Sequence, residues 1–194
     1  LMNPVRDFFD SLASSWDQKQ TKKEEDIRPL FDRIGLRKGD FVLDLACGTG
    51  TVTRLIHSYT EEKVTGMDIS PEMIAIAQKK YASCPWACFE CADFLECEQV
   101  ELYDFVVLYN AFPHFADPSL LSKKFAQVLK PGGRFAILHS LGRKELDAHH
   151  EAVPQNLSRH LNSPEEEAPA FGKEFSIEKA EEGEHFFLLT GKKR

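Results

Sequence analysis

The stretch VLDLACGTG at residues 42–50 most constrains the fold, because it places a glycine-rich turn directly after an apolar run. Gly48 and Gly50 allow tight curvature and close approach of the backbone to a ligand. The helix expected from about Gly50 would present free N–H groups to an anion. Asp68 ends the next apolar run, where a carboxylate commonly accepts hydrogen bonds from ribose hydroxyls. The stretch therefore predicts a nucleotide-type site at a strand–turn–helix.

Short apolar runs alternate with helical patterns from residue 41 onward. Ser70 and Pro71 predict a helix start, since serine is a favoured N-cap and proline is favoured at the first helical position. Asp117 and Pro118 predict another, which should end at 130–133. This alternation indicates a parallel sheet with helices on both faces, an α/β fold of the Rossmann-like doubly wound kind. The expected strands are 41–46, 63–68, 86–91, 103–110 and 134–140.

The flanking regions predict further helices and a closing hairpin. Residues 5–15 and 24–34 have helical patterns before the core, and 143–161 has one after it. Residues 163–169 predict a loop or a short helix, and the runs on either side of Glu182 and Gly183 predict an antiparallel hairpin. We expect one domain over 1–194, made of an N-terminal helical lid (1–38), a cofactor-binding core (39–140), and a substrate-side helix with the closing hairpin (141–194).

Composition narrows the class of partner. The net charge is −7, and the only basic block is 192–194, which disfavours nucleic acid and anionic membranes as partners. No apolar run approaches membrane-spanning length. The charged N-terminal residues predict no signal peptide, so we expect a cytoplasmic protein. In that compartment the five cysteines are not expected to form structural disulfides.

Two details argue against an NAD site. The third glycine of a G-x-G-x-x-G motif would be residue 53, which is Thr53, and Asp44 places a charge inside the first strand. The phosphate-loop motif G-x-x-x-x-G-K-S/T is absent from the sequence. An NAD-dependent oxidoreductase is therefore disfavoured.

The ordered motifs VLDLACGTG, VTGMDIS, CADF, FVVLYNAFPHF and LKPGGRFAILHS resemble those of class I S-adenosylmethionine-dependent methyltransferases. The resemblance covers roughly residues 8–140. The segment FFDSLASSWD is similar to the N-terminal part of small-molecule methyltransferases of the ubiquinone/menaquinone type, which often have tyrosine where this chain has Trp16. The resemblance implies a seven-stranded, mostly parallel sheet with an antiparallel last strand, S-adenosylmethionine as cofactor, and methyl transfer to a small molecule.

The resemblance also implies roles for particular residues. Asp44 would organise the loop near the cofactor's methionine amino group, and Asp68 would bind the ribose hydroxyls. Ala46 replaces the first loop glycine of the family. Asp93 would accept from the adenine amino group, or would simply cap the following turn. The remaining cofactor contacts implied are the backbone at Gly48 and Gly50, Met67 and Ile69 beside the adenosine, Ala92 and Phe94 beside the adenine, and Asn110 at the methionyl end and substrate mouth.

Three cysteines, Cys84, Cys88 and Cys91, have a C-x3-C-x2-C spacing that raises the question of an iron–sulfur cluster or a zinc site. Side chains alternate along a strand, so Cys88 and Cys91 should face opposite sides of the sheet. Packing of partly buried cysteines, with Cys47 also packing, is therefore preferred to a metal site.

Four histidines are candidates for catalysis, substrate contact or metal binding. His114 and His139 follow adjacent strands at the ligand-binding edge of an open α/β sheet, and His149 and His150 lie in the next helical pattern. Three interpretations remain open: the histidines are structural, His114 or His139 is a general base or substrate contact, or His114, His139 and one of His149 and His150 bind a divalent metal.

The acceptor site is less constrained than the cofactor site. Trp16 and Phe112 are candidates for an apolar acceptor pocket, and Arg143 for holding an acidic substrate group. Asn110, His114 and His139 are the candidate catalytic residues. The short region after 140 allows a site completed by a second subunit, hence a homodimer. Quinone-type carbon methylation is one alternative function, and a regulatory protein that binds cofactor or metal without turnover is another.

Overall fold

The computed structural model describes residues 3–98, 102–143, 145–146 and 157–194. The chain divides into two compact units, Leu1–Glu98 and Gln99–Arg194. Seven strands form a mixed sheet in the order β3-β2-β1-β4-β5-β7-β6, which confirms the predicted doubly wound α/β class. The strands are β1 (Val42–Leu45), β2 (Val64–Asp68), β3 (Ala87–Cys91), β4 (Tyr103–Tyr109), β5 (Leu129–His139), β6 (Phe175–Gly183) and β7 (Phe186–Lys193).

The first unit contains the parallel strands β1, β2 and β3. Leu45 pairs with Met67, and Asp68 pairs with Cys91, so the three strands end at one edge. Every residue of β1 and β2 is buried, as expected for parallel strands covered on both faces. The helices of this unit are α1 (Pro4–Leu12), the 3-10 turn η1 (Ala13–Ser15), α2 (Trp16–Lys19), α3 (Glu24–Phe31), α4 (Thr53–Thr60) and α5 (Pro71–Lys80).

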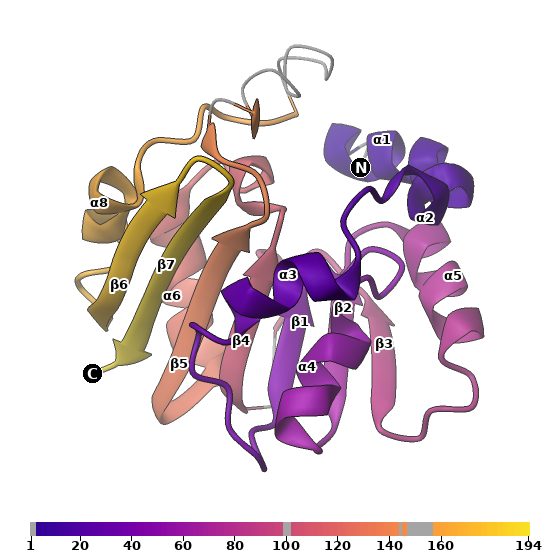
Figure 1. Ribbon diagram of the computed structural model, residues 1–194, viewed down its shortest axis with the longest axis horizontal. Coiled ribbons are helices and arrows are strands. Elements are labelled where there is room, and N and C mark those ends of the chain that lie inside the picture. The colour runs from indigo at the N-terminus through magenta and orange to yellow at the C-terminus, as the bar shows by residue number, and fades with distance from the viewer. Residues whose placement is uncertain (1–2, 99–101, 144, 147–156) are drawn as a thin grey trace. The chain divides into compact units, whose positions relative to one another are not determined.

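Local capping explains where these helices begin. The side chain of Asn3 accepts from the backbone N–H groups of Val5 and Arg6, so α1 starts at Pro4. Ser70 accepts from Met73 in the same way at the start of α5, as the sequence predicts. The single helix expected over 5–15 is instead α1 followed by η1, and α1 and η1 both contact α5, beside which α1 and α2 are drawn in Figure 1.

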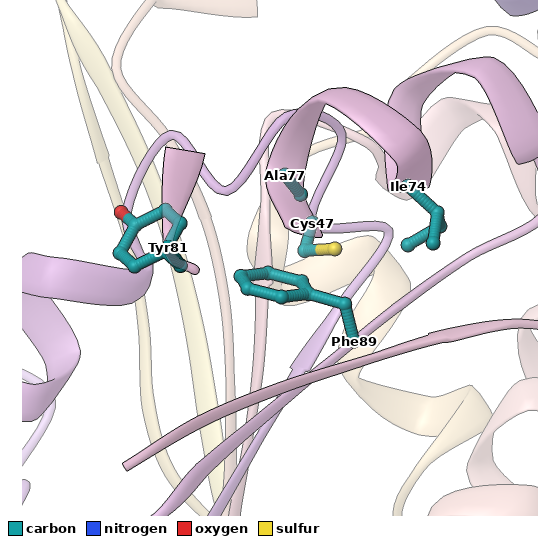
Figure 2. Packing of buried hydrophobic residues seen from close by; sticks show 5 residues of the cluster. All are labelled: Cys47, Ile74, Ala77, Tyr81 and Phe89. Atoms are coloured by element: carbon teal, nitrogen blue, oxygen red, sulfur yellow. The ribbon is translucent and has the colours of Figure 1, made fainter. Parts of the chain in front are cut away.

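A small apolar cluster lies under the glycine loop. Cys47, from the loop itself, packs with Ile74 and Ala77 of α5, with Tyr81, and with Phe89 of β3. Figure 2 shows the Cys47 side chain between Ala77 and the ring of Phe89. The cluster gives the loop an apolar underside, and it confirms the packing role that the sequence predicts for Cys47.

The second unit contains β4 and β5 in parallel, with β7 antiparallel to both β5 and β6. The predicted closing hairpin is therefore β6 and β7, drawn in yellow tones in Figure 1. The remaining elements are the 3-10 turn η2 (Phe112–His114), α6 (Pro118–Val128), α8 (Pro164–Glu167) and the 3-10 turn η3 (Ala168–Ala170). Helix α6 contacts β5, and α8 contacts β6 and β7.

Two boundaries in this unit differ from the sequence prediction. Strand β5 begins at Leu129, not at residue 134, because Leu129 already pairs with Tyr103 before a register shift. The predicted helix 143–161 does not reach its expected end, since residues 157–163 have no helix. Residues 144 and 147–156 lie outside the described part of the chain. Across the described residues, no helix is both long and apolar enough to cross a membrane.

Candidate functional site

The loop after β1 has a backbone that glycine favours. Three of its residues have positive φ, namely Ala46 at 53°, Gly48 at 54° and Gly50 at 77°. A Cβ atom at Gly50 would lie 2.7 Å from the Tyr81 ring, and the Tyr81 hydroxyl donates to the Gly50 carbonyl at 2.7 Å. Gly50 is thus required both for conformation and for packing. Ala46 takes a strained conformation that costs about 1 kcal/mol in a non-glycine residue.

Asp68, at the end of β2, holds the glycine loop. Its Oδ2 accepts from the backbone N–H of Gly48 at 2.8 Å, and its Oδ1 accepts from that of Ser70 at 2.9 Å. An ionised carboxylate has about four lone-pair sites, so beside its backbone donors Asp68 can still accept from a further group such as a ribose hydroxyl. Burial raises the pKa of Asp68, although the backbone donors oppose that shift. The loop after β1 and the acid at the end of β2 are therefore joined by hydrogen bonds.

Asp44, inside β1, has a buried carboxylate oxygen with no hydrogen-bond partner among the described residues. The residue is 1% exposed, and Thr53 donates to its Oδ2 at 2.6 Å. Its Oδ1 has no hydrogen-bond partner within the described chain. Burial raises the pKa of Asp44 to about 7, the Thr53 hydrogen bond opposes that shift, and the charge of Asp68 adds to it. Such an unsatisfied buried acceptor costs about 1–3 kcal/mol, and a cationic ligand group would relieve that cost.

The other predicted cofactor contacts lie at the same strand ends. Met67 is 1% exposed within β2, and Phe94 is 4% exposed after β3. Ile69 and Ala92 are half-buried. Asp93 accepts from the backbone N–H of Leu95 at 3.1 Å through Oδ1, as a turn-capping residue does. The structure therefore brings Asp44, the loop glycines, Asp68 and Asp93 to one edge of the first unit.

The N-terminal segment, defined as residues 3–19, contacts the loops after all three strands of this unit. Asn3 Nδ2 donates to Asp93 Oδ2 at 3.4 Å after β3. Ser70 Oγ donates to Asp10 Oδ1 at 2.5 Å after β2. Thr49 Oγ1 donates to Asp17 Oδ1 at 2.5 Å after β1. These contacts lie 90, 60 and 32 residues apart in sequence, and no short motif indicates them.

Trp16 lies against the glycine loop. Its indole Nε1 is 3.4 Å from the position that a Cβ atom on Gly48 would occupy, and its ring packs edge-on against Phe9 with centroids 5.7 Å apart. The side chain is half-buried. Trp16 therefore flanks the same turn that is predicted to pass under the cofactor, and its acceptor-pocket role stays a prediction.

In the second unit, Asn110 is bonded to a serine that the sequence did not single out. The backbone N–H of Ser140 donates to Asn110 Oδ1 at 2.9 Å, and Asn110 Nδ2 donates to Ser140 Oγ at 3.1 Å. The Tyr109 hydroxyl also donates to Ser140 Oγ, at 2.8 Å. Asn110 is exposed and has a left-handed φ of 55°. The position of Ser140, directly after the fifth strand and beside His139, is the signal that could have found it.

His114 and His139 have different surroundings. His139 is fully buried at the end of β5, and its ring packs edge-on against Phe187. His114 is half-buried in η2, with Nδ1 2.9 Å from the carbonyl oxygen of Leu157. A carbonyl only accepts, so Nδ1 of His114 carries a proton, and in the neutral ring Nε2 is the basic nitrogen.

The other acceptor-site candidates contact protein groups. Phe112 is fully buried, and the Arg159 guanidinium lies 4.4 Å from the centre of its ring. Arg143 pairs with Glu182 through two hydrogen bonds of 2.5 and 2.6 Å. Their roles toward a substrate stay predictions. In this structure Phe112 is a packing residue, and Arg143 forms an ion pair with Glu182 of β6.

The described residues give no support to a metal site. Within them, no group of three or more His, Cys, Asp or Glu side chains gathers to hold a metal ion. This finding includes Cys84, Cys88 and Cys91, and the packing interpretation of that stretch stays a prediction. His149 and His150, which the predicted histidine cluster requires, lie outside the described residues. Burial raises the pKa of Cys47 well above its ordinary value, which disfavours the reactive thiolate form.

A comparison with known protein families finds a match that includes these residues. The family model described as a methyltransferase domain matches residues 42–133. Residues 42–133 of the chain are thus similar to this methyltransferase family. The match begins at β1 and ends within β5, so it contains the glycine loop, Asp68 and Asp93. The recognition made from the ordered sequence motifs is confirmed.

Relatives and solved structures agree with that assignment. The chloroplastic 2-phytyl-1,4-beta-naphthoquinone methyltransferase of Arabidopsis thaliana is 32% identical over 146 residues, which are 71% of this chain and 55% of that protein. This chain spans little more than half of that relative. This chain also shares its fold with a chain in the solved complex between the Haloferax volcanii Trm112 methyltransferase activator and a methyltransferase. The TM-score is 0.79 and the identity 21%, with 95% of this chain and 97% of that chain covered.

A second solved structure has a similar fold. The N-methyltransferase NodS of Bradyrhizobium japonicum WM9, determined in complex with S-adenosyl-L-homocysteine, has a TM-score of 0.75 to this chain. The identity is 14%, with 98% and 99% of the two chains covered, so the likeness concerns the fold. This protein thus shares the fold of that N-methyltransferase.

Proposed function

We propose that this protein is an S-adenosylmethionine-dependent methyltransferase that acts on a small molecule. The observation that carries the proposal is the unsatisfied, buried Oδ1 of Asp44 beside a glycine loop that Asp68 holds through Gly48. A cofactor with a cationic amino group at one end and a ribose in the middle fits these two acids, because each acid offers an acceptor to one of those groups.

The residues of the first unit would hold this cofactor. The Asp44 carboxylate would accept from the amino group, and the lone pairs that Asp68 retains would accept from ribose hydroxyls. Asp93 would accept from the adenine amino group in place of, or together with, Asn3. S-adenosylmethionine, when bound, supplies an electrophilic methyl group on a sulfonium sulfur. Catalysis then consists mainly of holding the acceptor atom in line at about 3 Å.

The second unit would serve the acceptor. Ligands of open α/β sheets bind beyond the carboxyl ends of the strands. Asn110 directly follows β4, and Ser140 directly follows His139, the last residue of β5. His114 is proposed as the base for acceptors that must lose a proton, because its Nδ1–H bond to Leu157 leaves Nε2 as the basic nitrogen. His139, being fully buried, would act through packing.

Calorimetric titration with S-adenosyl-L-homocysteine tests the cofactor assignment. Wild type should bind, Asp44→Asn and Asp68→Ala should bind at least about 10-fold more weakly, and Asp104→Asn should bind like wild type. Asp104 is a matched control, since it lies near the amino end of β4 and pairs with Lys130. A folded wild-type protein that does not bind would contradict the proposal.

Turnover distinguishes an enzyme from a regulator. The protein is incubated with S-adenosylmethionine and a panel of small acceptors, and the product S-adenosyl-L-homocysteine is measured. Carbon methylation of a quinone-type ring is a second candidate, favoured by the naphthoquinone methyltransferase relative, and naphthohydroquinones therefore belong in the panel. Tight cofactor binding with no product from any acceptor would favour the regulatory alternative.

A further inference from the structure

Three polar side chains meet at the ends of β4 and β5, and we call Tyr109, Asn110 and Ser140 the serine cluster. The orientation of the Asn110 amide is fixed, because the Ser140 backbone N–H donates to Oδ1 and thereby directs Nδ2 toward Ser140 Oγ. The Tyr109 hydroxyl also donates to Ser140 Oγ. Ser140 Oγ thus accepts two hydrogen bonds, at 2.8 and 3.1 Å.

A count of donors and lone pairs shows what Ser140 has left to offer. A serine hydroxyl has two lone pairs and one proton. Both lone pairs are occupied by Tyr109 and Asn110, so neither bond uses the Ser140 proton. Accepting two hydrogen bonds also polarises a hydroxyl and strengthens it as a donor. Ser140 is 8% exposed, so its proton has little access to bulk water. Among the described residues the Ser140 proton is donated to no acceptor, and leaving it unused would be costly.

The backbone conformation of Asn110 supports a functional role for this residue in addition to forming a turn. Its φ of 55° is left-handed, a conformation that glycine adopts without strain. Asparagine tolerates this conformation and adds an amide that glycine lacks, and that amide fixes Ser140. The Asn110 backbone N–H also donates to the Leu138 carbonyl at 2.9 Å. Non-glycine residues in this conformation concentrate at functional sites.

We propose that Ser140 is a binding residue that selects methyl acceptors bearing an oxyanion, namely an enolate, phenolate or carboxylate. The polarised Ser140 proton would donate to that oxygen, while Tyr109 and Asn110 act as positioning residues. Burial raises the pKa of Tyr109, so its phenol remains a neutral donor to Ser140. The inference rests on the proposed methyltransferase function and names the acceptor chemistry of that same activity.

The test uses two matched pairs of probes, titrated into protein saturated with S-adenosyl-L-homocysteine. One pair is 2-hydroxy-1,4-naphthoquinone, an enolate at neutral pH, and its methyl ether. The other is 1-naphthoate and its methyl ester. Wild type should bind at least one anion roughly 10-fold or more tightly than its neutral partner, because a hydrogen bond to a charged group is stronger than one to a neutral group. Which pair shows the preference separates enolates from carboxylates.

The variants separate a binding role from a structural role. Ser140→Ala should lose the preference for the anion by about 10- to 100-fold while binding S-adenosyl-L-homocysteine as wild type does. Asn110→Gly and Tyr109→Phe should each reduce the preference several-fold. Ser122→Ala is the matched control, since Ser122 is a 1% exposed serine on α6 of the same unit, and it should change nothing.

Two results would overturn the inference. One is a wild-type protein that binds S-adenosyl-L-homocysteine but prefers no anion of either pair, which leaves the proposed function in place. The other is an Ser140→Ala variant that keeps the wild-type preference. Failure of folded wild type to bind S-adenosyl-L-homocysteine at all would instead contradict the proposed function.

Discussion

Thr49, in the glycine loop, donates a hydrogen bond of 2.5 Å to Asp17, in helix α2 of the N-terminal segment. Lys80 strengthens this connection, since its Nζ lies 2.6 Å from the other Asp17 oxygen and 3.2 Å from Thr49 Oγ1. Burial raises the pKa of Asp17, but the hydrogen bonds from Lys80 and Thr49 outweigh that effect and lower it overall. The N-terminal segment is thereby fastened to the loop that is proposed to hold the cofactor.

Asp17→Ala should loosen the N-terminal segment with only a small loss of global stability. The Asp17 side chain is 48% exposed, and pairs of this kind contribute about 0.2–1 kcal/mol. Amide hydrogen exchange over residues 3–19 should accelerate, while β1 and β2 stay protected. Asp26→Ala on α3 provides an exposed-acid control. Unchanged exchange over 3–19 would show that the Thr49–Asp17 bond does not hold the segment.

In the cofactor-free protein, Asp44→Asn should increase the free energy of unfolding near neutral pH. The pKa of Asp44 is raised to about 7, from 3.8, so between these values the folded protein binds a proton that the unfolded chain releases. Its contribution to stability is therefore lost as pH rises from about 4 to about 7. Asparagine does not ionise, so urea unfolding of the variant should show a shallower decline across this window. Equal pH slopes for the variant and wild type would contradict the raised pKa.

Ala46→Gly should raise the free energy of unfolding by roughly 0.5–1 kcal/mol. Ala46 has a φ of 53°, which glycine adopts without the steric cost that a Cβ atom brings. The gain is limited because glycine also makes the unfolded chain more flexible. Urea denaturation measures the change. A destabilised variant would mean that the Ala46 methyl group makes contacts worth more than the strain.

Gly50→Ala should destabilise the protein by about 2–4 kcal/mol, by combining left-handed strain with a steric clash. The new Cβ would lie 2.7 Å from the Tyr81 ring and 3.3 Å from Phe89. Gly39→Ala is a close control, because Gly39 has a φ of +87° but nothing within 4 Å of its Cβ position. It should cost only about 1 kcal/mol of strain. Similar losses in the two variants would show that the Tyr81 contact relaxes without cost.

Arg159→Met should cost roughly 3–5 kcal/mol of stability. Glu167 is 4% exposed and accepts from Arg159 Nη1 and Nη2 at 2.6 and 3.1 Å, so the variant leaves a buried carboxylate without its cation. Arg159→Lys should restore only part of the loss, because lysine cannot form the paired bonds and also stack on Phe112. The double variant Arg159→Met/Glu167→Leu should recover most of it. A nearly neutral Arg159→Met would mean that water replaces the guanidinium.

Features set by local sequence could be predicted. The Ser70 and Asp117 caps, the glycine loop and the hairpin around Gly183 each depend on a few neighbouring residues, and the structure has all of them. The positions of Gly48 and Asp68 at one strand edge follow from the alternation of strands and helices. The order of the sequence motifs was then enough to predict the resemblance to methyltransferases.

Features that join distant residues could not be predicted. The Asn3–Asp93 and Asp10–Ser70 contacts depend on how the N-terminal helices fold back, which no spacing reveals. Ser140 was missed because its role lies in what Tyr109 and Asn110 donate to it, and serine after a strand is common. The early start of β5 was missed because proline and glycine at 131–133 usually end an element, yet Leu129 pairs with Tyr103.

The order of β6 and β7 has a consequence for biosynthesis. Strand β7 lies between β5 and β6 in the second unit, so β6 has no partner until residues 186–193 have been made. The first unit ends at Glu98, and its sheet of β1, β2 and β3 contains only residues made before that point. During translation, every residue of the first unit has therefore been made while the second is still being synthesised. Until β7 emerges, nascent β5 and β6 have unpaired edges, which are open to association with other chains and to chaperones.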